Sequence, residues 1–394
     1  MRTPSVPELA CAVTRRATSL FLPALEHLEP ELTAVYEGTR VLVTGGAGFI
    51  AGQTLRTILP LGPSRVVVCD HDENSLAELV RDLRTSSVIN ASSQFIPRLV
   101  DVTGPLIERV IEEDGPFDVV LAFAACKHVR SERDAASALH MLNVNINGTM
   151  RPVLAAKQQN PDARVFVVST DKAADPASVM GASKRVMEML VLGRFPEATT
   201  TRFANVAFSS GSLLESWLIR LANGQVLPVP ADTRRYFVTP QESGQLCTLA
   251  SVAPPGSIII PDPEAVGSRD LLDALVQVLE SLELRPLNIT EDLVGATQPT
   301  GREYPVLVTE RDTPGEKAAE VFVGENEVAE PWIDPLFSVR SPRDLPAAED
   351  FAAWVNVASR LIRGPDLDEI EARLSAALNG FGHVRGRGGL DDRI

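Results

Sequence analysis

The sequence predicts an α/β protein whose centre is a doubly wound parallel sheet, with a smaller mixed α/β region on its C-terminal side. Apolar, strand-like runs alternate with amphipathic stretches from residue 39 to residue 206. A glycine-rich turn follows the first run, and an aspartate ends the second. Four polar residues close the fifth run, and an open parallel sheet has its ligand crevice beyond the carboxyl ends of such strands. Together these observations favour one fold.

The elements follow in chain order. Residues 1–38 are predicted to be a helical appendage, because leucines recur at helical spacing from Leu20 to Leu32, although Pro23 and Pro30 interrupt them. Residues 39–206 are predicted to form the ligand-binding domain that contains the sheet. Its expected strands cover residues 40–44, 65–70, 95–100, 118–124, 164–169 and 199–206.

Beyond residue 206 the pattern becomes irregular and rich in proline. It predicts a smaller substrate-binding region over 207–340, partly interleaved with the main sheet through a strand at 257–260. Residues 341–380 are expected to form C-terminal helices broken at Gly364-Pro365. The last stretch, 381–394, is rich in Gly, Arg and Asp and is predicted to be a flexible tail.

The composition argues against nucleic acid and membranes as partners. The formal net charge of −15 repels both nucleic acid and anionic lipid surfaces. No apolar run reaches the roughly 18 residues that a membrane span needs, and we expect no signal peptide. The four cysteines and five histidines are scattered, so neither a disulfide framework nor a metal site is predicted. We therefore expect a cytoplasmic location.

The first predicted strand leads into a turn typical of dinucleotide-binding sites. Gly45 and Gly48 allow a tight turn and let backbone N–H groups approach a pyrophosphate where the next helix begins, at Phe49 and Ile50. A plain strand–helix turn is the alternative, but Asp70 ends the second strand 25 residues after Gly45. An acid there accepts hydrogen bonds from both ribose hydroxyls and repels a 2′-phosphate. NAD is therefore predicted as the cofactor, on a Rossmann-type sheet.

Asp101 and Val102 follow the third predicted strand and are expected to meet the adenine. Beyond them, two segments are especially specific: 169–173 reads Ser-Thr-Asp-Lys-Ala and 179–185 reads Val-Met-Gly-Ala-Ser-Lys-Arg. Over about residues 38–335 the chain resembles the extended short-chain dehydrogenase/reductases. More narrowly, it resembles the nucleotide-sugar 4,6-dehydratases of polysaccharide biosynthesis, of the UDP-N-acetylglucosamine type. The other matching segments are 124–129, 145–149, 202–206, 235–239 and 314–317.

Met180 stands where most of the superfamily has a tyrosine that takes a hydroxyl proton. A thioether has no proton to exchange, so the acid–base work must fall to Thr170, Asp171 and Lys172. The resemblance to the Met-bearing branch of the family implies the same. It also implies that Lys184 holds the nicotinamide ribose.

In the reaction that the resemblance implies, a hexose is oxidised at C4, loses water across C5 and C6, and regains hydride at C6. Asp171, with a raised pKa, is the candidate acid for the C6 hydroxyl, and Lys172, when desolvated, the candidate base at C5. Thr170 would hydrogen-bond the C4 oxygen. The group that removes the C4 hydroxyl proton stays open. A helix cap is the alternative for Thr170 and Asp171, although a cap does not account for the adjacent lysine.

The resemblance places Ala124 beside the cofactor, and Lys127 and His128 along the substrate cleft. His128 could equally be a packed group behind the cleft. Arg235 suits a diphosphate because its planar fork matches phosphate oxygens, and a solvated surface arginine is the alternative. Asn205 is also expected to contact substrate.

Asn145 is interpreted as structural, satisfying backbone groups near the catalytic strand. Three positions depart from the family pattern: Ser210 and Thr313 replace arginines, and Arg130 replaces a proline, with an apparent two-residue insertion before Asn145. Each charged hydrogen bond lost from a diphosphate pocket is worth roughly 1.5–3 kcal/mol. A non-standard substrate is therefore expected.

The sequence thus predicts an NAD-dependent nucleotide-sugar 4,6-dehydratase with a nucleotide-activated hexose as substrate. One alternative is an epimerase or net dehydrogenase on the same fold, which Met180 disfavours. Another is a non-catalytic NAD-binding sensor, which Ser210 and Thr313 keep open. We expect a homo-oligomer. The nucleotide, the sugar and the stereochemistry at C5 are left open.

Overall fold

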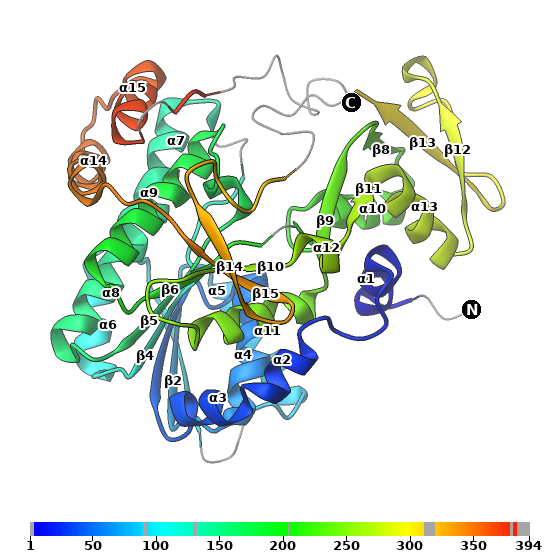
Figure 1. Ribbon diagram of the computed structural model, residues 1–394. Helices are drawn as coiled ribbons and strands as arrows, with labels where there is room; N and C mark the ends of the chain where they lie inside the picture. The colour runs from blue at the N-terminus through cyan, green and yellow to red at the C-terminus, as the bar shows by residue number, and fades with distance from the viewer. Residues whose placement is uncertain are drawn as a thin grey trace.

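The computed structural model describes residues 4–89, 93–128, 132–203, 205–310, 320–378 and 381–383. Its centre is a nine-stranded sheet in the order β14-β15-β10-β6-β5-β4-β1-β2-β3 (Figure 1). The strands from β3 to β10 in this order are parallel, and β15 and β14 are antiparallel additions at one edge. The strand bounds are β1 (Arg40–Thr44), β2 (Arg65–Asp70), β3 (Gln94–Leu99), β4 (Val119–Ala122), β5 (Arg164–Val168), β6 (Thr199–Thr201), β10 (Ile258–Pro261), β14 (Val328–Ile333) and β15 (Leu336–Arg340).

Apolar residues run through the central strands because helices bury both faces of the sheet. Successive side chains point to opposite faces, so Val41 and Val43 pack into one core while Leu42 packs into the other. The first core lies under α4 (Phe49–Ile58), α5 (Glu73–Thr85) and α11 (Pro240–Ser251). The second lies under α6 (Leu106–Asp114), α7 (Ala135–Leu142), α8 (Gly148–Gln159) and α9 (Val179–Arg194). The predicted doubly wound sheet is confirmed.

The prediction of one strand over residues 199–206 is wrong. β6 (Thr199–Thr201) stays in the main sheet, whereas β7 (Asn205–Val206) pairs in parallel with β9 (Arg234–Val238) in another sheet. The chain leaves the main sheet at Arg202, whose side chain is fully buried among acidic groups. A run of β-forming residues does not reveal such a change of partner, because the pattern is the same in either sheet.

A second, smaller region contains two three-stranded sheets, in the orders β11-β9-β7 and β12-β13-β8. Its core is separate from those of the main sheet. The strand expected at 257–260 to join the main sheet is confirmed as β10, which lies there parallel to β6. The remaining elements here are β8 (Leu227–Pro230), β11 (Ser268–Asp270), β12 (Arg285–Ile289), β13 (Glu303–Thr309), α10 (Leu213–Ala222), α12 (Pro263–Val266) and α13 (Leu271–Ser281).

The N-terminal segment joins the two regions. α1 (Val6–Thr14) packs against α13 in the smaller region, whereas α2 (Leu22–His27) and α3 (Glu29–Tyr36) contribute to a core of the main sheet (Figure 1). Between them, Arg16 donates two hydrogen bonds to the buried carboxylate of Glu242, at 2.9 and 2.7 Å. The segment is therefore bound to both parts of the molecule.

The C-terminal helices α14 (Leu345–Ala358) and α15 (Leu367–Ala377) pack on α7 and α9. After them, the ring of His383 lies 2.8 Å from a carboxylate oxygen of Glu371 and 3.0 Å from one of Glu132. Glu132 also accepts a hydrogen bond from the backbone N–H of Met180, at 2.8 Å, in the first turn of α9. The C-terminal segment is thereby connected to the helix that carries Met180 and Lys184.

Replacing His383 with glutamine is expected to remove a pH-dependent part of the stability. The hydrogen bond to Glu132, with a further one to Glu371, raises the pKa of His383 above 6.5. The stabilisation that His383 contributes is therefore complete below pH 6.5, and it is lost as the pH rises through the higher pKa of His383 in the folded state. Urea unfolding of the wild type and of His383→Gln at about pH 5.5 and about pH 8.5 measures this contribution. The difference between their free energies of unfolding should shrink at the higher pH. An equal difference at both pH values would contradict it, and exposed His27→Gln is the control.

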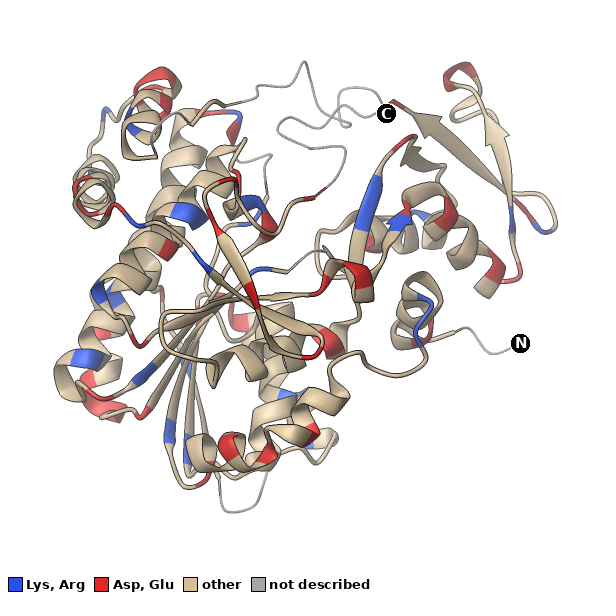
Figure 2. Cartoon of the chain, in the orientation of Figure 1, with Lys and Arg blue, Asp and Glu red and all other residues tan. Residues whose placement is uncertain are grey.

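Acidic residues, which give the chain its net charge of −15, are spread over many of the outer helices (Figure 2). Within the described ranges, the structure has no helix that is both long and apolar enough to cross a membrane. Nor do the described residues include a group of three or more His, Cys, Asp or Glu side chains arranged to hold a metal ion.

Candidate active site

Two adjoining cavities lie beyond the carboxyl ends of the parallel strands, of about 330 and 650 Å³. They share the turn from Gly45 to Gly48 as a common wall. Every residue predicted to bind the cofactor lines at least one of them. The smaller cavity is lined by Asp70, Asp101, Val102 and Ala124, the larger by Phe49, Ile50 and Lys184, and both by Gly45 and Gly48.

The glycine turn has a backbone conformation that favours glycine, and it lies too close to the neighbouring strand for a side chain to fit. Gly45 has a φ of +65°, in the left-handed region. A Cβ atom placed on it would lie 2.4 Å from the backbone nitrogen of Ala124, at the end of β4. The turn therefore packs directly on the neighbouring strand, which leaves room above it for a ligand.

Gly45→Ala is expected to destabilise the protein more than Gly62→Ala does. Both glycines have left-handed φ angles, of +65° and +79°, but a Cβ on Gly62 meets nothing closer than 4.0 Å. The left-handed strain alone costs about 1–2 kcal/mol, and the collision with Ala124 should add about 1–3 kcal/mol at Gly45. Urea denaturation of the two variants compares them. Equal losses would show that the contact with Ala124 does not matter.

Asp70 has a structural task besides its predicted one. Its buried carboxylate accepts hydrogen bonds from the backbone N–H of Ala47 at 2.9 Å and of Asp72 at 3.1 Å. It thus holds the glycine turn against the end of β2. Each carboxylate oxygen can accept more than one hydrogen bond, so a contact with ribose hydroxyls stays a prediction that this geometry permits.

The residues present fit a dinucleotide. α4 begins after Gly48 without a side-chain cap, and Phe49, Ile50 and Ala51 line the larger cavity. The first N–H groups of a helix lack intrahelical partners and, with the helix dipole, they favour a negative group such as a pyrophosphate. The cavity wall therefore supplies the donors that such a cofactor needs.

Thr170, Asp171 and Lys172 follow β5 and line the larger cavity. The Thr170 hydroxyl donates a hydrogen bond of 2.7 Å to Asp171, and the Lys172 Nζ lies 3.6 Å from the same oxygen. The Asp171 carboxylate is almost fully buried. Thr170 also caps a short 3₁₀ turn, Asp171–Ala173. Thr170 thus both caps this turn and contacts Asp171 in a polar cluster at the cavity, so the helix cap does not exclude the cluster.

α9 brings Met180 and Lys184 to this cluster. Both line the larger cavity, and Gly181 lies so close that a Cβ on it would be 2.5 Å from the Lys172 carbonyl oxygen. The buried Lys184 Nζ donates to the Val168 carbonyl at 3.1 Å. Burial lowers the pKa of Lys184 to about 8, against the opposing charge of Glu188. The lysine is therefore placed between the end of β5 and the cavity.

Asn145 is confirmed as a structural residue. Its amide pairs with both backbone groups of Cys126, at 2.8 and 2.9 Å, and donates to the Ser183 hydroxyl at 2.8 Å. It lies in a π-helical turn, Asn143–Asn147, a distortion that is frequent at functional sites. Asn145 thereby fixes the strand end before Lys127 against α9.

The predicted substrate residues are only partly brought together. Lys127, His128 and Asn205 line the larger cavity, but Arg235 does not. Desolvation lowers the pKa of Lys127, while Glu215 opposes this. A Cβ on Gly211 would lie 2.4 Å from the His128 ring, so the imidazole covers that glycine. Residues 129–131, 311–319 and 384–394 lie outside the described ranges, and with them Arg130, Thr313, the segment 314–317 and most of the predicted tail.

The alternative interpretation of Arg235, as a solvated surface residue, is wrong, and its contact with a diphosphate stays a prediction. Its side chain is 7% exposed, and its Nε lies 3.3 Å from a carboxylate oxygen of Glu320. The sequence analysis missed Glu320. This carboxylate also accepts a hydrogen bond of 2.7 Å from Asn205 and one of 3.3 Å from the backbone N–H of Tyr236. A lone glutamate beyond the Pro-Gly-Glu-Lys segment carries no local signal, because β7 and β9 meet it only through the tertiary structure.

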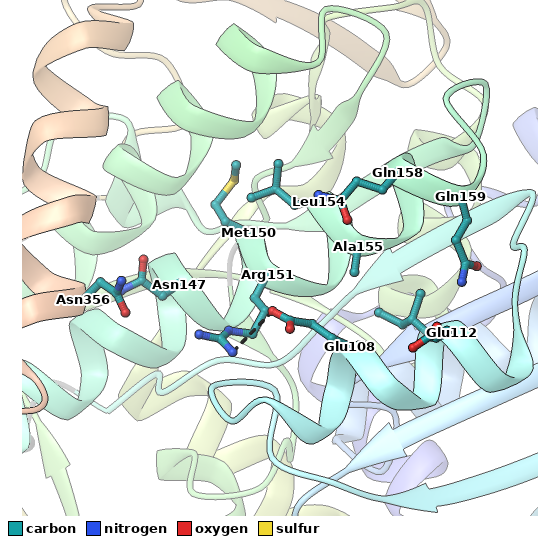
Figure 3. A pocket seen from close by; sticks show the side chains of 11 residues that line it. Glu108, Glu112, Asn147, Met150, Arg151, Leu154, Ala155, Gln158, Gln159 and Asn356 are labelled. Carbon is teal, nitrogen blue, oxygen red and sulfur yellow. Dashed lines mark ion pairs between the residues drawn. The ribbon is translucent and has the colours of Figure 1, made fainter.

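A third hollow, of about 620 Å³, lies between α6 and α8 (Figure 3). Arg151 crosses it towards Glu108, with a nitrogen–oxygen distance of 3.4 Å, and Asn356 of α14 closes one end. It shares no lining residue with the two cavities above. None of the predicted site residues belongs to it.

Comparisons with known proteins agree with this arrangement. A capsular polysaccharide biosynthesis protein, CapD from Staphylococcus aureus, is 28% identical over 298 residues, which are 73% of this chain and 45% of that protein. An inverting UDP-N-acetylglucosamine 4,6-dehydratase from Campylobacter jejuni is 26% identical over 218 residues, 52% of this chain and 61% of the enzyme. The chain thus spans about half the length of these relatives.

Solved structures show the same fold. Pen from Bacillus thuringiensis superimposes with a TM-score of 0.63 at 22% identity, over 79% of this chain and 91% of Pen. UDP-glucose 4-epimerase from Stenotrophomonas maltophila was solved with NAD and formylated UDP-arabinopyranose. It superimposes with a TM-score of 0.53 at 20% identity, over 73% of this chain and 90% of the epimerase. The model of the family described as polysaccharide biosynthesis protein matches residues 41–330. This match confirms the relationship predicted from the sequence, and the chain belongs to the polysaccharide biosynthesis protein family.

Proposed function

We propose that this protein is an NAD-dependent nucleotide-sugar 4,6-dehydratase with a non-standard hexose substrate. One observation carries the proposal: Thr170, Asp171 and Lys172 line the same cavity as the glycine turn and Met180. An acid, a hydroxyl and an amine thus lie beside the expected cofactor, in the cavity where Met180 takes the place of a tyrosine. The Campylobacter relative, named as a UDP-N-acetylglucosamine 4,6-dehydratase, supports the assignment.

The cofactor would occupy both cavities. Asp70 would accept hydrogen bonds from the adenosine ribose, the N–H groups at the start of α4 would bind the pyrophosphate, and Lys184 would hold the nicotinamide ribose. Bound there, NAD would take up hydride from C4 of the sugar and later deliver it to C6. The buried ammonium of Lys184 would also favour negative charge on the C4 oxygen during oxidation.

The side chains after β5 would carry out the elimination. A ketone at C4 acidifies the C5 proton, which Lys172 in its neutral form would remove, and Asp171 would protonate the departing C6 hydroxyl. The electrons of the C5–H bond form the C5–C6 double bond as water leaves. Thr170 donates a hydrogen bond to Asp171, so the two side chains would be held in a fixed relation while Thr170 meets the C4 oxygen.

The substrate side supports a change in specificity. Ser210 lines the larger cavity, where the family pattern has an arginine, and Ser209 and Ser212 lie beside it. Hydroxyl groups in place of a guanidinium offer weaker contacts to a diphosphate. Among the described residues, the cations that line the larger cavity are Lys127, Lys172 and Lys184, and of these Lys127 was predicted to contact substrate. The nucleotide or the hexose is accordingly expected to differ from UDP-N-acetylglucosamine.

The test is a panel of UDP-, dTDP-, GDP- and ADP-hexoses, read by mass spectrometry after incubation with protein and NAD. We expect one sugar to become lighter by one water, and deuterium placed at C4 to reappear at C6. Accumulation of NADH with a keto-sugar would indicate a net dehydrogenase, and an isomer of unchanged mass an epimerase. No conversion with NAD bound would indicate a sensor.

A further inference from the structure

The first turn of α9 is held by a residue from another segment. The first N–H groups of a helix have no intrahelical partners and need other acceptors. The Ser178 hydroxyl accepts one of them, from Gly181 at 3.1 Å, as a local cap. A carboxylate oxygen of Glu132 accepts another, from Met180 at 2.8 Å. A tertiary contact thus fixes the helix that brings Met180 and Lys184 to the larger cavity.

Glu132 connects this turn with two other parts of the molecule. It lies shortly after Lys127 and His128, which follow β4 and line the larger cavity. Its second carboxylate oxygen lies 3.0 Å from the Nε2 atom of His383, after α15, and the Nδ1 atom of that ring lies 2.8 Å from Glu371. The side chains of Glu132 and His383 are only 4% and 6% exposed. Hydrogen bonds to both oxygens offset the cost of burying this carboxylate.

The same turn packs directly on the polar cluster after β5. A Cβ on Gly181 would lie 2.5 Å from the Lys172 carbonyl oxygen. Lys184, one turn after Met180, donates to the Val168 carbonyl at 3.1 Å. A displacement of the first turn would therefore move Met180 and Lys184 relative to Lys172. A misplacement of about 1 Å at a reaction site can lower the rate by about 10²-fold.

We propose that Glu132 is a positioning residue: it sets the place of α9, and with it of Met180 and Lys184, against the turn after β5, and His383 holds Glu132 there. The C-terminal segment from α14 to His383 is then part of the active-site framework, although none of its described residues lines either cavity beyond the strands. The effect on turnover rests on the proposed function. The effect on NAD binding rests only on the cofactor site, because Lys184 is expected at the nicotinamide ribose.

The test compares Glu132→Ala with Glu132→Gln. Glutamine keeps a carbonyl oxygen for the Met180 N–H, whereas alanine removes the acceptor. If the correct position of α9 falls to about a tenth of the population in Glu132→Ala, the Kd for NAD measured by calorimetry rises about tenfold. We also expect kcat to fall by about 10²-fold while KM for the sugar stays within about threefold. In Glu132→Gln, Kd and kcat should both stay within about threefold of the wild type.

Glu349→Ala is the matched control. Glu349 of α14 also joins the C-terminal helices to α9, through Arg194 at 3.6 Å, but this half-exposed ion pair lies at the opposite end of α9. Kd and kcat should be unchanged in this variant. Equal effects in Glu132→Ala and Glu349→Ala, or a failure of glutamine to restore what alanine loses, would overturn the proposal.

A third variant tests the proposal even if Glu132→Ala does not fold. His383→Ala leaves the contact between Glu132 and Met180 but removes the group that holds the carboxylate, so Kd should rise by about threefold. Amide hydrogen exchange of residues 179–184 without cofactor, read by mass spectrometry, should be faster in His383→Ala than in Glu349→Ala. Unchanged exchange and Kd would refute the role of the C-terminal segment. Absence of turnover in the wild type would refute the dehydratase, whereas Kd and exchange still decide the positioning.

Discussion

Arg202→Met is expected to lower the free energy of unfolding by about 3–5 kcal/mol, because the buried carboxylates of Glu188 and Glu327 lose their fully buried partner and keep Arg185 beside them. The Arg202 side chain is 0% exposed. It donates to Glu188 of α9 at 2.8 and 2.6 Å, and to Glu327, just before β14, at 2.5 and 2.9 Å. Burial works against ionisation of Glu327, yet Arg202 holds the pKa of that carboxyl at about 2.

Urea denaturation at neutral pH measures the loss. The stabilisation that Glu327 receives is complete above pH 4.5 and is lost as the pH falls towards 2, so the gap between wild type and variant should narrow in acid. Arg81→Met is the control, since the Arg81 side chain is 71% exposed and its pair with Glu78 lies at the surface. A loss no greater than that of Arg81→Met would show that the buried network does not stabilise the fold.

Asp171→Asn is expected to reduce kcat by about 10²–10⁴-fold, the range typical of losing a general acid. The amide keeps the size of the carboxyl and can still accept the Thr170 hydrogen bond, so the fold should be unchanged. Asp171 lines the larger cavity, whereas the residues expected at the adenosine line the smaller one. NAD binding should therefore persist.

Single-turnover kinetics on the substrate found in the panel, with NAD binding measured in parallel by calorimetry, would test this. Lys172→Ala should likewise reduce kcat by about 10²–10⁴-fold and leave NAD bound. Asp175→Asn, an exposed aspartate of the same loop, is the control and should retain activity. Undiminished turnover in Asp171→Asn would remove this residue from the mechanism.

Local patterns were enough to predict the sheet and the cofactor side of the site. Strand β1, the turn at Gly45 and the end of β2 at Asp70 are neighbours in an order that a βαβ unit imposes, so their spacing predicts their geometry. The structural role of Asn145 was also predicted correctly. Its partners are Cys126, which follows β4, and Ser183 of α9, which follows the neighbouring strand β5.

The sequence by itself determined the alternation of strands and helices along the chain, the glycine turn and the polar cluster after β5, because each depends on residues close together in the chain. Only the tertiary structure decided that the chain leaves the main sheet at Arg202, that Arg235 is buried, and that Glu320 contacts Asn205 and Arg235. These three depend on polar contacts between residues 84 to 125 positions apart in the chain. Such pairs form only when separate elements pack, and no local periodicity records which carboxylate a buried arginine will meet.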